Sequence, residues 1–229
     1  MPLPSLALPP TEGDNSTNVP AADLTHITLV LDRSGSMDEF RDDAIGGFNA
    51  FVEQQRAAPG KATLTLVQFD HEYTTVYHAQ PIADVPRLDR EHYIPRGQTA
   101  LYDAIGRSVA ETAEHIAKLP EDERPTRVVV AILTDGHENA SKEYSYERVR
   151  AILAEKATAA GWHVLFLASE MDVAASAVRM GVLESHTRTF EPSRRGTRDA
   201  FGHVSRVVTS MRTSRPALPG DDDPKKKPN

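Results

Sequence analysis

The six residues from Val128 to Leu133 are all apolar, and this run constrains the fold of the chain more than any other feature. The run is far too short for a membrane-spanning helix, which needs about 20 apolar residues. Successive side chains of a strand point to opposite faces of a sheet, so both faces of such a strand have to be covered. A strand of this kind is typical of the middle of a parallel sheet with helices on either side, and the run therefore predicts an α/β protein.

Other short apolar runs alternate with segments in which apolar residues recur at helical spacing. This alternation is typical of parallel strands joined by crossover helices. Only three residues separate the expected strands at 62–69 and 73–78, which indicates a hairpin and adds one antiparallel edge strand. We therefore expect a three-layer fold with a mostly parallel central sheet and helices on both faces. The remaining strands are expected at 25–31, 128–133, 163–168 and 187–190, and the helices at 40–58, 100–116, 149–157, 173–180 and 201–211.

The two ends of the chain differ in composition from the part between them. Residues 1–22 are rich in proline and small polar residues, and residues 213–229 contain Asp-Asp-Asp-Pro-Lys-Lys-Lys. Such segments bury little apolar surface, and we expect both to be disordered. A chain of 229 residues is long enough for one α/β domain and too short for two large ones. The expected domain covers residues 23–212.

Charge and cysteine content exclude several classes of protein. The net charge is -7, from 33 acidic and 26 basic side chains, which argues against binding to nucleic acid through phosphate neutralisation. The chain has no cysteine, so disulfides and thiolate zinc sites are excluded. Residues 1–10 carry four prolines and no basic residue, unlike a signal peptide. We expect a cytoplasmic protein that binds neither nucleic acid nor membrane.

Oxygen-bearing side chains gather in three loops of the expected fold. Asp32, Ser34 and Ser36 follow the first strand, Asp135 follows the central strand, and Thr99 precedes the second helix. The carboxyl ends of parallel strands meet at one edge of a sheet, where α/β proteins bind ligands. A hard cation such as Mg2+ takes about six oxygen ligands, and these five residues offer oxygen and no soft donor. The sequence therefore predicts a divalent-cation site. The simpler alternative, in which the hydroxyls cap helices and the aspartates end strands, explains each residue but not their convergence.

Asp-x-Ser-x-Ser after a strand, a distant threonine before a helix, and Thr-Asp-Gly after a central strand resemble the metal-ion-dependent adhesion site (MIDAS) of von Willebrand factor A (VWA) domains. The resemblance covers about residues 24–212 and implies the Rossmann-like VWA fold, as in stand-alone bacterial members. It implies that Ser34, Ser36 and Thr99 are hydroxyl ligands and that Asp32 and Asp135 act directly or through water.

The same resemblance implies a function. The bound ion would be Mg2+, with Mn2+ or Ca2+ as other candidates, and an Asp or Glu of a protein partner would complete its coordination. The chain would then be a non-enzymatic adaptor or assembly domain.

An enzyme is the alternative. Asp32 could be the nucleophile of a Mg2+-dependent phosphatase of the haloacid dehalogenase type. That chemistry needs a second acid two residues further on, and the chain has Ser34 there. We therefore favour a binding domain and expect no phosphatase activity.

Several other residues are candidates for a functional role. His137, Glu138 and Asn139 follow the metal-site aspartate and could select partners, although Glu138 could simply be solvated. Asp103 could orient the threonine loop or serve as an ordinary acid in the first turn of a helix. The nine histidines include no His-Glu-x-x-His pair, so we expect no zinc site. Trp162 is expected in the core.

Overall fold

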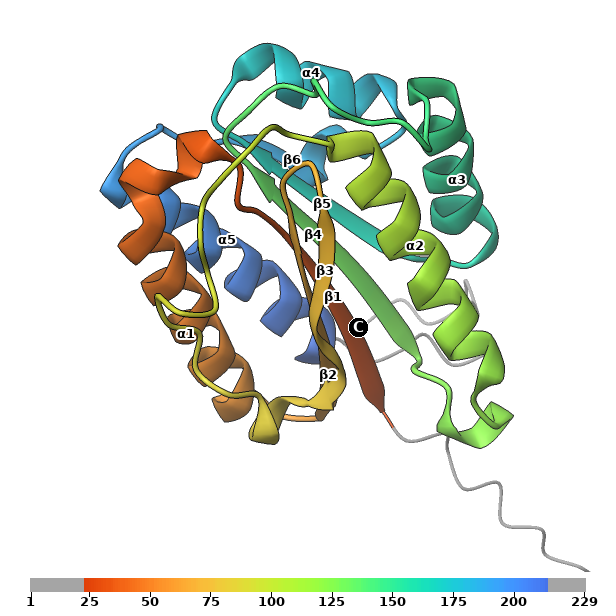
Figure 1. The fold of residues 1–229 in the computed structure, drawn as a ribbon. Helices are drawn as coiled ribbons and strands as arrows, with labels where there is room; N and C mark the ends of the chain where they lie inside the picture. Colours follow the sequence, from red (N-terminus) through yellow and green to blue (C-terminus); the bar gives the residue numbers. More distant parts are fainter. Residues whose placement is uncertain (1–22, 214–229) are drawn as a thin grey trace, which may run out of the picture.

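A six-stranded sheet runs through the middle of the molecule, with helices packed on both of its faces (Figure 1). The computed structural model describes residues 23–213, and the expectations for residues 1–22 and 214–229 lie outside this part of the chain. The strand order is β3-β2-β1-β4-β5-β6, and the β2–β3 pair is antiparallel whereas the other pairs are parallel. The predicted sheet with one antiparallel edge strand is confirmed. The strands are β1 (Leu24–Asp32), β2 (Lys61–Phe69), β3 (Tyr73–Pro81), β4 (Arg127–Thr134), β5 (His163–Ala168) and β6 (Thr187–Thr189).

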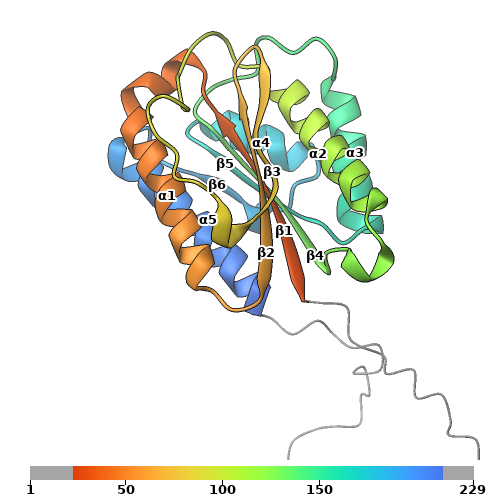
Figure 2. The same cartoon turned by 60° about the horizontal axis from the view of Figure 1, so that its bottom comes forward.

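Helices α1 and α5 cover one face of the sheet, and α2, α3 and α4 cover the other (Figure 2). Each layer has its own hydrophobic core, and Trp162 lies in the core beneath α2, α3 and α4, as expected. None of the helices within residues 23–213 has the length and apolar character needed to cross a membrane. The helices are α1 (Arg41–Ala57), α2 (Leu101–Lys118), α3 (Tyr146–Ala159), α4 (Met171–Arg179) and α5 (Arg194–Thr213).

Strand β4 lies between β1 and β5, and its side chains are buried on both faces. Its odd-numbered residues from Val129 to Leu133 belong to the core under α1 and α5, and its even-numbered residues from Val128 to Ile132 belong to the opposite core. The apolar run is therefore the doubly covered central strand that the sequence predicts.

Two helices begin earlier or later than their apolar pattern indicates. A 3-10 helix at Gly35–Phe40 precedes α1, and its buried residues Met37 and Phe40 hold this tighter turn against the core. Helix α5 begins well before Phe201, where its apolar stripe starts; the Ser193 hydroxyl accepts a 3.0 Å hydrogen bond from Gly196 N at its start, and Arg198 donates a 2.8 Å hydrogen bond to Asp43 of α1. Polar contacts of this kind leave no periodic signal in the sequence.

The register of the two central strands brings their carboxyl ends together. Leu31 of β1 lies opposite Leu133 of β4, so Asp32 and Thr134 are neighbours at the same edge of the sheet. The segments that follow the two strands therefore start from neighbouring positions.

Gly46 and Gly47 of α1 allow a matched test of the contact between α1 and α5. A methyl group on Gly47 would lie 2.3 Å from Cδ2 of Phe201, whereas one on Gly46 would have no atom within 4 Å. Gly47→Ala should lower the free energy of unfolding by about 1–3 kcal/mol, because Phe201 would have to move in a filled core. Gly46→Ala should leave it unchanged or raise it by up to about 1 kcal/mol, because alanine favours the helix. Urea unfolding measures both, and equal effects would contradict this packing.

Candidate metal site

The Asp32 carboxylate is fully buried at the end of β1 and is held on both of its oxygens. The backbone N–H of Ser34 donates to Oδ1 at 2.6 Å, and the Thr134 hydroxyl donates to Oδ2 at 2.6 Å. The buried Tyr93 hydroxyl donates to the backbone carbonyl of Asp32 at 2.6 Å. Burial, with a smaller contribution from the nearby Asp135, raises the pKa of Asp32 to about 6 despite the opposing effect of these hydrogen bonds. The hydrogen-bond donors around Asp32 therefore do not fully offset the cost of burying its negative charge.

The three predicted hydroxyl ligands surround one point beside Gly136. A methyl group on Gly136 would lie 3.2 Å from Thr99 Oγ1, 3.7 Å from Ser36 Oγ and 4.0 Å from Ser34 Oγ. The two serine oxygens are 3.1 Å apart. Only a residue without a side chain leaves this space open between the hydroxyls, which explains the glycine after Asp135.

Asp135 joins this group from the end of β4. Its Oδ1 accepts a 2.7 Å hydrogen bond from the Ser36 hydroxyl. Partial burial raises the pKa of Asp135, and the charge of Glu170 acts in the same direction. All five residues predicted from the sequence thus lie in one cluster, built from three separate segments of the chain.

The donor set fits a hard divalent cation. It consists of two carboxylates and three hydroxyls, with no sulfur or nitrogen donor among the five. Mg2+ takes about six oxygen ligands, so these residues leave room for water or an outside oxygen. Ser34 and Thr99 are buried, whereas Ser36 is exposed, so an outside ligand would approach from the side of Ser36.

A second buried aspartate, Asp70, supports the site from the turn between β2 and β3. Its carboxylate accepts hydrogen bonds from Nε of Arg33 at 3.0 Å and Nε of Arg96 at 2.9 Å. Its backbone carbonyl accepts from Ala100 N at 2.8 Å. Asp70 therefore ties the segment after β1 to the segment that carries Thr99. The sequence analysis missed this role; the only signal was an aspartate at the carboxyl end of a strand.

The loop after β4 is fastened to Thr99 and to the start of α2. The backbone N–H of Thr99 donates to Oδ1 of Asn139 at 2.8 Å, and the N–H of Asn139 donates back to the Thr99 carbonyl at 3.0 Å. Glu138 Oε2 accepts from the N–H of Tyr102 at 2.9 Å and from the hydroxyl of Ser141 at 2.7 Å. The expectation that Glu138 is simply solvated is therefore wrong, because its carboxylate organises the loop.

Asp103, in the first turn of α2, acts on the same loop. Its carboxylate accepts hydrogen bonds of 2.7 to 2.9 Å from the backbone N–H groups of Lys142, Glu143 and Tyr144. Neither expectation for Asp103 described this contact, since the partners come from a loop far along the chain. Of the three rim residues, only His137 has an exposed side chain that does not organise this loop.

No protein-family model matches the sequence, and no curated protein matches it. Solved structures do match. Proximal thread matrix protein 1 from the mussel byssus, in a structure with a zinc-occupied MIDAS motif, is 18% identical with a TM-score of 0.56, and the match covers 82% of this chain and 46% of that chain. The vWF domain of the type V pili tip protein Mfa5 from Porphyromonas gingivalis is 11% identical with a TM-score of 0.60, and the match covers 86% and 99%. The pilus adhesin SpaC from Lactobacillus rhamnosus GG is 12% identical with a TM-score of 0.62, and the match covers 83% and 30%.

These matches confirm the predicted VWA fold. The chain spans about half of the mussel protein and under a third of SpaC, and it spans nearly the whole vWF domain of Mfa5. At such low identity the likeness extends to the fold and not to the partners or activities of those proteins.

The hydrogen bond from Thr134 to Asp32 can be tested by Thr134→Val, which keeps the shape and removes the donor. In EDTA the variant should lose about 1–3 kcal/mol of unfolding free energy, because the buried Asp32 oxygen loses its donor and the Gly136 N–H loses the hydroxyl to which it donates at 3.2 Å. Thr158→Val is the matched control, because that hydroxyl donates at a similar 2.7 Å to a carbonyl on the exposed surface of α3. The control should change stability by less than about 0.5 kcal/mol. Equal losses in urea unfolding would contradict the anchoring of Asp32.

Proposed function

We propose that the chain binds one divalent cation, Mg2+ in the first place, through Asp32, Ser34, Ser36, Thr99 and Asp135, and that this ion binds a carboxylate of a protein partner. The observation that carries the proposal is the convergence of five oxygen-bearing side chains around the space beside Gly136. The zinc-occupied MIDAS motif of the mussel protein supports a cation at this place in the fold.

The chemistry of the donors supports an anionic partner ligand. Three of the five donors are neutral hydroxyls, so the ion keeps its attraction for an oxygen anion from outside. Because Mg2+ prefers about six oxygen ligands, a partner's Asp or Glu can take a remaining position. The exposed Ser36 marks the open side from which this group would arrive.

Exposed apolar side chains beside the site favour a protein as the partner. Met171 is 79% exposed and follows Glu170, whose charge acts on Asp135. Ile94 is 51% exposed and follows Tyr93, which contacts Asp32. Large exposed apolar residues next to a polar site are typical of protein interfaces.

The geometry argues against the alternative in which Asp32 is the nucleophile of a phosphatase. Both carboxylate oxygens accept short hydrogen bonds within the chain, and the side chain is fully buried. The second acid that the reaction needs is replaced by Ser34. We therefore propose a binding role and no catalytic residue.

The metal assignment predicts two opposite effects of Asp135→Asn. Without metal the Asp32 and Asp135 carboxylates repel each other, and the amide can still accept the Ser36 hydrogen bond, so the variant should melt no lower than the native chain in EDTA. Mg2+ at about 100 times its dissociation constant should stabilise the native chain by about 2.7 kcal/mol and the variant far less. Thermal unfolding with and without Mg2+ measures both effects.

Asp199→Asn is the control for this experiment, because Asp199 is an exposed aspartate on α5. It should keep the full response to Mg2+. If Asp135→Asn melts well below the native chain in EDTA and still responds fully to Mg2+, Asp135 is a structural residue and the assignment fails.

Partner binding should depend on the ion. Proteins retained by the immobilised native chain in Mg2+ should elute with EDTA or with high concentrations of acetate, because both treatments remove the link between ion and carboxylate. The same proteins should be absent from an Asp135→Asn column and present on an Asp199→Asn column. Retention that is indifferent to EDTA and to Asp135→Asn would place the interface elsewhere on the molecule.

A further inference from the structure

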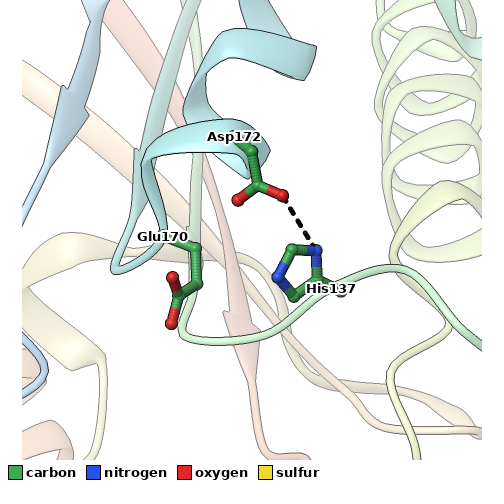
Figure 3. A group of neighbouring side chains, drawn as sticks. All are labelled: His137, Glu170 and Asp172. Carbon is green, nitrogen blue, oxygen red and sulfur yellow. Dashed lines mark ion pairs between the residues drawn. The ribbon is translucent and has the colours of Figure 1, made fainter.

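Three side chains beside the candidate site offer ligands of a different kind. His137, Glu170 and Asp172 each present one possible ligand atom, and these atoms all lie within 4.8 Å of one another (Figure 3). The His137 Nδ1 and Asp172 Oδ2 atoms are 3.6 Å apart. We propose that these three residues, called the rim cluster below, form a second cation site that takes a transition-metal ion such as Zn2+.

The fold holds the backbone of the rim cluster in place. His137 follows β4, whereas Glu170 and Asp172 stand at the start of α4, directly after β5. The two loops are joined where Ser169 donates to the Asp135 carbonyl through its hydroxyl at 2.7 Å and to the Thr134 carbonyl through its N–H at 3.2 Å. The three side chains therefore start from a fixed frame, although they come from separate segments.

The distances suit an ion after a small closure. Zinc binds nitrogen and oxygen ligands at about 2.0–2.2 Å, so two ligands of a tetrahedral zinc ion are about 3.3–3.6 Å apart. The His137 Nδ1 and Asp172 Oδ2 atoms, 3.6 Å apart, are already close to this spacing, and all three ligand atoms lie within 4.8 Å of one another. All three side chains are exposed, so rotation about their own bonds can bring the ligand atoms closer without moving the core.

A surface ion pair would account for the positions of His137 and Asp172, but it would not account for Glu170. The Glu170 carboxylate makes no hydrogen bond or ion pair with any residue in the described range 23–213, and its charge acts on Asp135. Asp172 uses Oδ1 for the N–H of Val173 and leaves Oδ2 toward the imidazole. Two carboxylates thus converge on one imidazole, and the chain supplies little positive charge to offset theirs. A bound cation would supply that charge.

The donors select a different ion from the one expected at the first site. One imidazole and two carboxylates suit zinc and related transition metals, whereas a set made only of oxygen donors suits Mg2+. Three protein ligands leave a fourth position of a tetrahedral ion open. His137 and Asp172 also line a cavity of about 220 Å³, which gives a fourth ligand room to enter.

The proposal of zinc at the rim cluster departs from the expectation that the chain has no zinc site. That expectation looked for two histidines near each other in the sequence. Here a single histidine is joined by two acids from the next strand–helix connection, and only the parallel pairing of β4 with β5 brings them together.

The test is a zinc titration of the full chain labelled with 15N in its histidine rings. One ring signal, removed by His137→Gln, should shift at the lowest zinc concentrations. Glu170→Gln should weaken the zinc affinity read from that signal by about tenfold or more, a loss at the lower end of that seen for altered metal sites. Ser34→Ala should leave the signal and its affinity unchanged, because this variant alters only the first site.

His92→Gln is the matched control, because His92 forms an exposed pair with Asp89 at 2.6 Å but belongs to no three-residue metal group in the described chain. This variant should not change the first zinc-dependent shift. If zinc shifts the His92 ring as readily as the His137 ring, or if Glu170→Gln leaves the affinity at His137 unchanged, the rim cluster is only a surface ion pair. If the site around Asp32 and Asp135 binds no Mg2+, the chain will show no stabilisation by Mg2+, whatever happens at the rim cluster. The two proposals can therefore be contradicted independently.

Discussion

The burial of the Asp32 carboxylate at the end of β1 is the constraint on which the neighbouring loops depend. A buried carboxylate is costly unless its oxygens are paired, and here the donors are the N–H of Ser34 and the hydroxyl of Thr134. The first donor requires the chain to turn directly after the strand, which brings the serine hydroxyls to the same edge. The second requires β4 to end beside β1, which brings Asp135 there. The hydrogen bonds of one buried carboxylate thus link the geometry of the candidate site to the register of the sheet.

Two buried aspartates at the ends of neighbouring strands are satisfied in different ways. Asp70, after β2, contacts the guanidinium groups of Arg33 and Arg96, so the chain supplies its own positive charge. Asp32, after β1, receives hydrogen bonds from neutral donors, and its pKa is raised to about 6 by burial and by the nearby Asp135. Charge compensation inside the protein therefore identifies Asp70 as structural. The same reasoning favours an external cation for Asp32, because two carboxylates meet there without a basic partner of their own.

Sequence reasoning was most successful where the signal is periodic or local. The apolar run of β4 predicted the doubly covered strand, and the Asp-x-Ser-x-Ser segment with Thr99 and Asp135 predicted residues that the fold does bring together. It was least successful for polar contacts between distant loops. Glu138 looks like any surface acid in the sequence, because most of its hydrogen-bond partners are backbone N–H groups that no side-chain pattern reveals. The rim cluster was missed for the same reason, since it exists only once β4 and β5 are paired.

The loop after β4 is organised before any partner arrives. Glu138 and Asn139 fasten it to the start of α2, and Asp103 holds its later part through three backbone N–H groups. A binding site whose backbone is already fixed loses little conformational entropy on association, so more of the interaction free energy remains as affinity. A rigid site also cannot reshape itself around different partners. Selectivity must then come from the side chains that remain exposed around it, which include His137 and the apolar Ile94 and Met171.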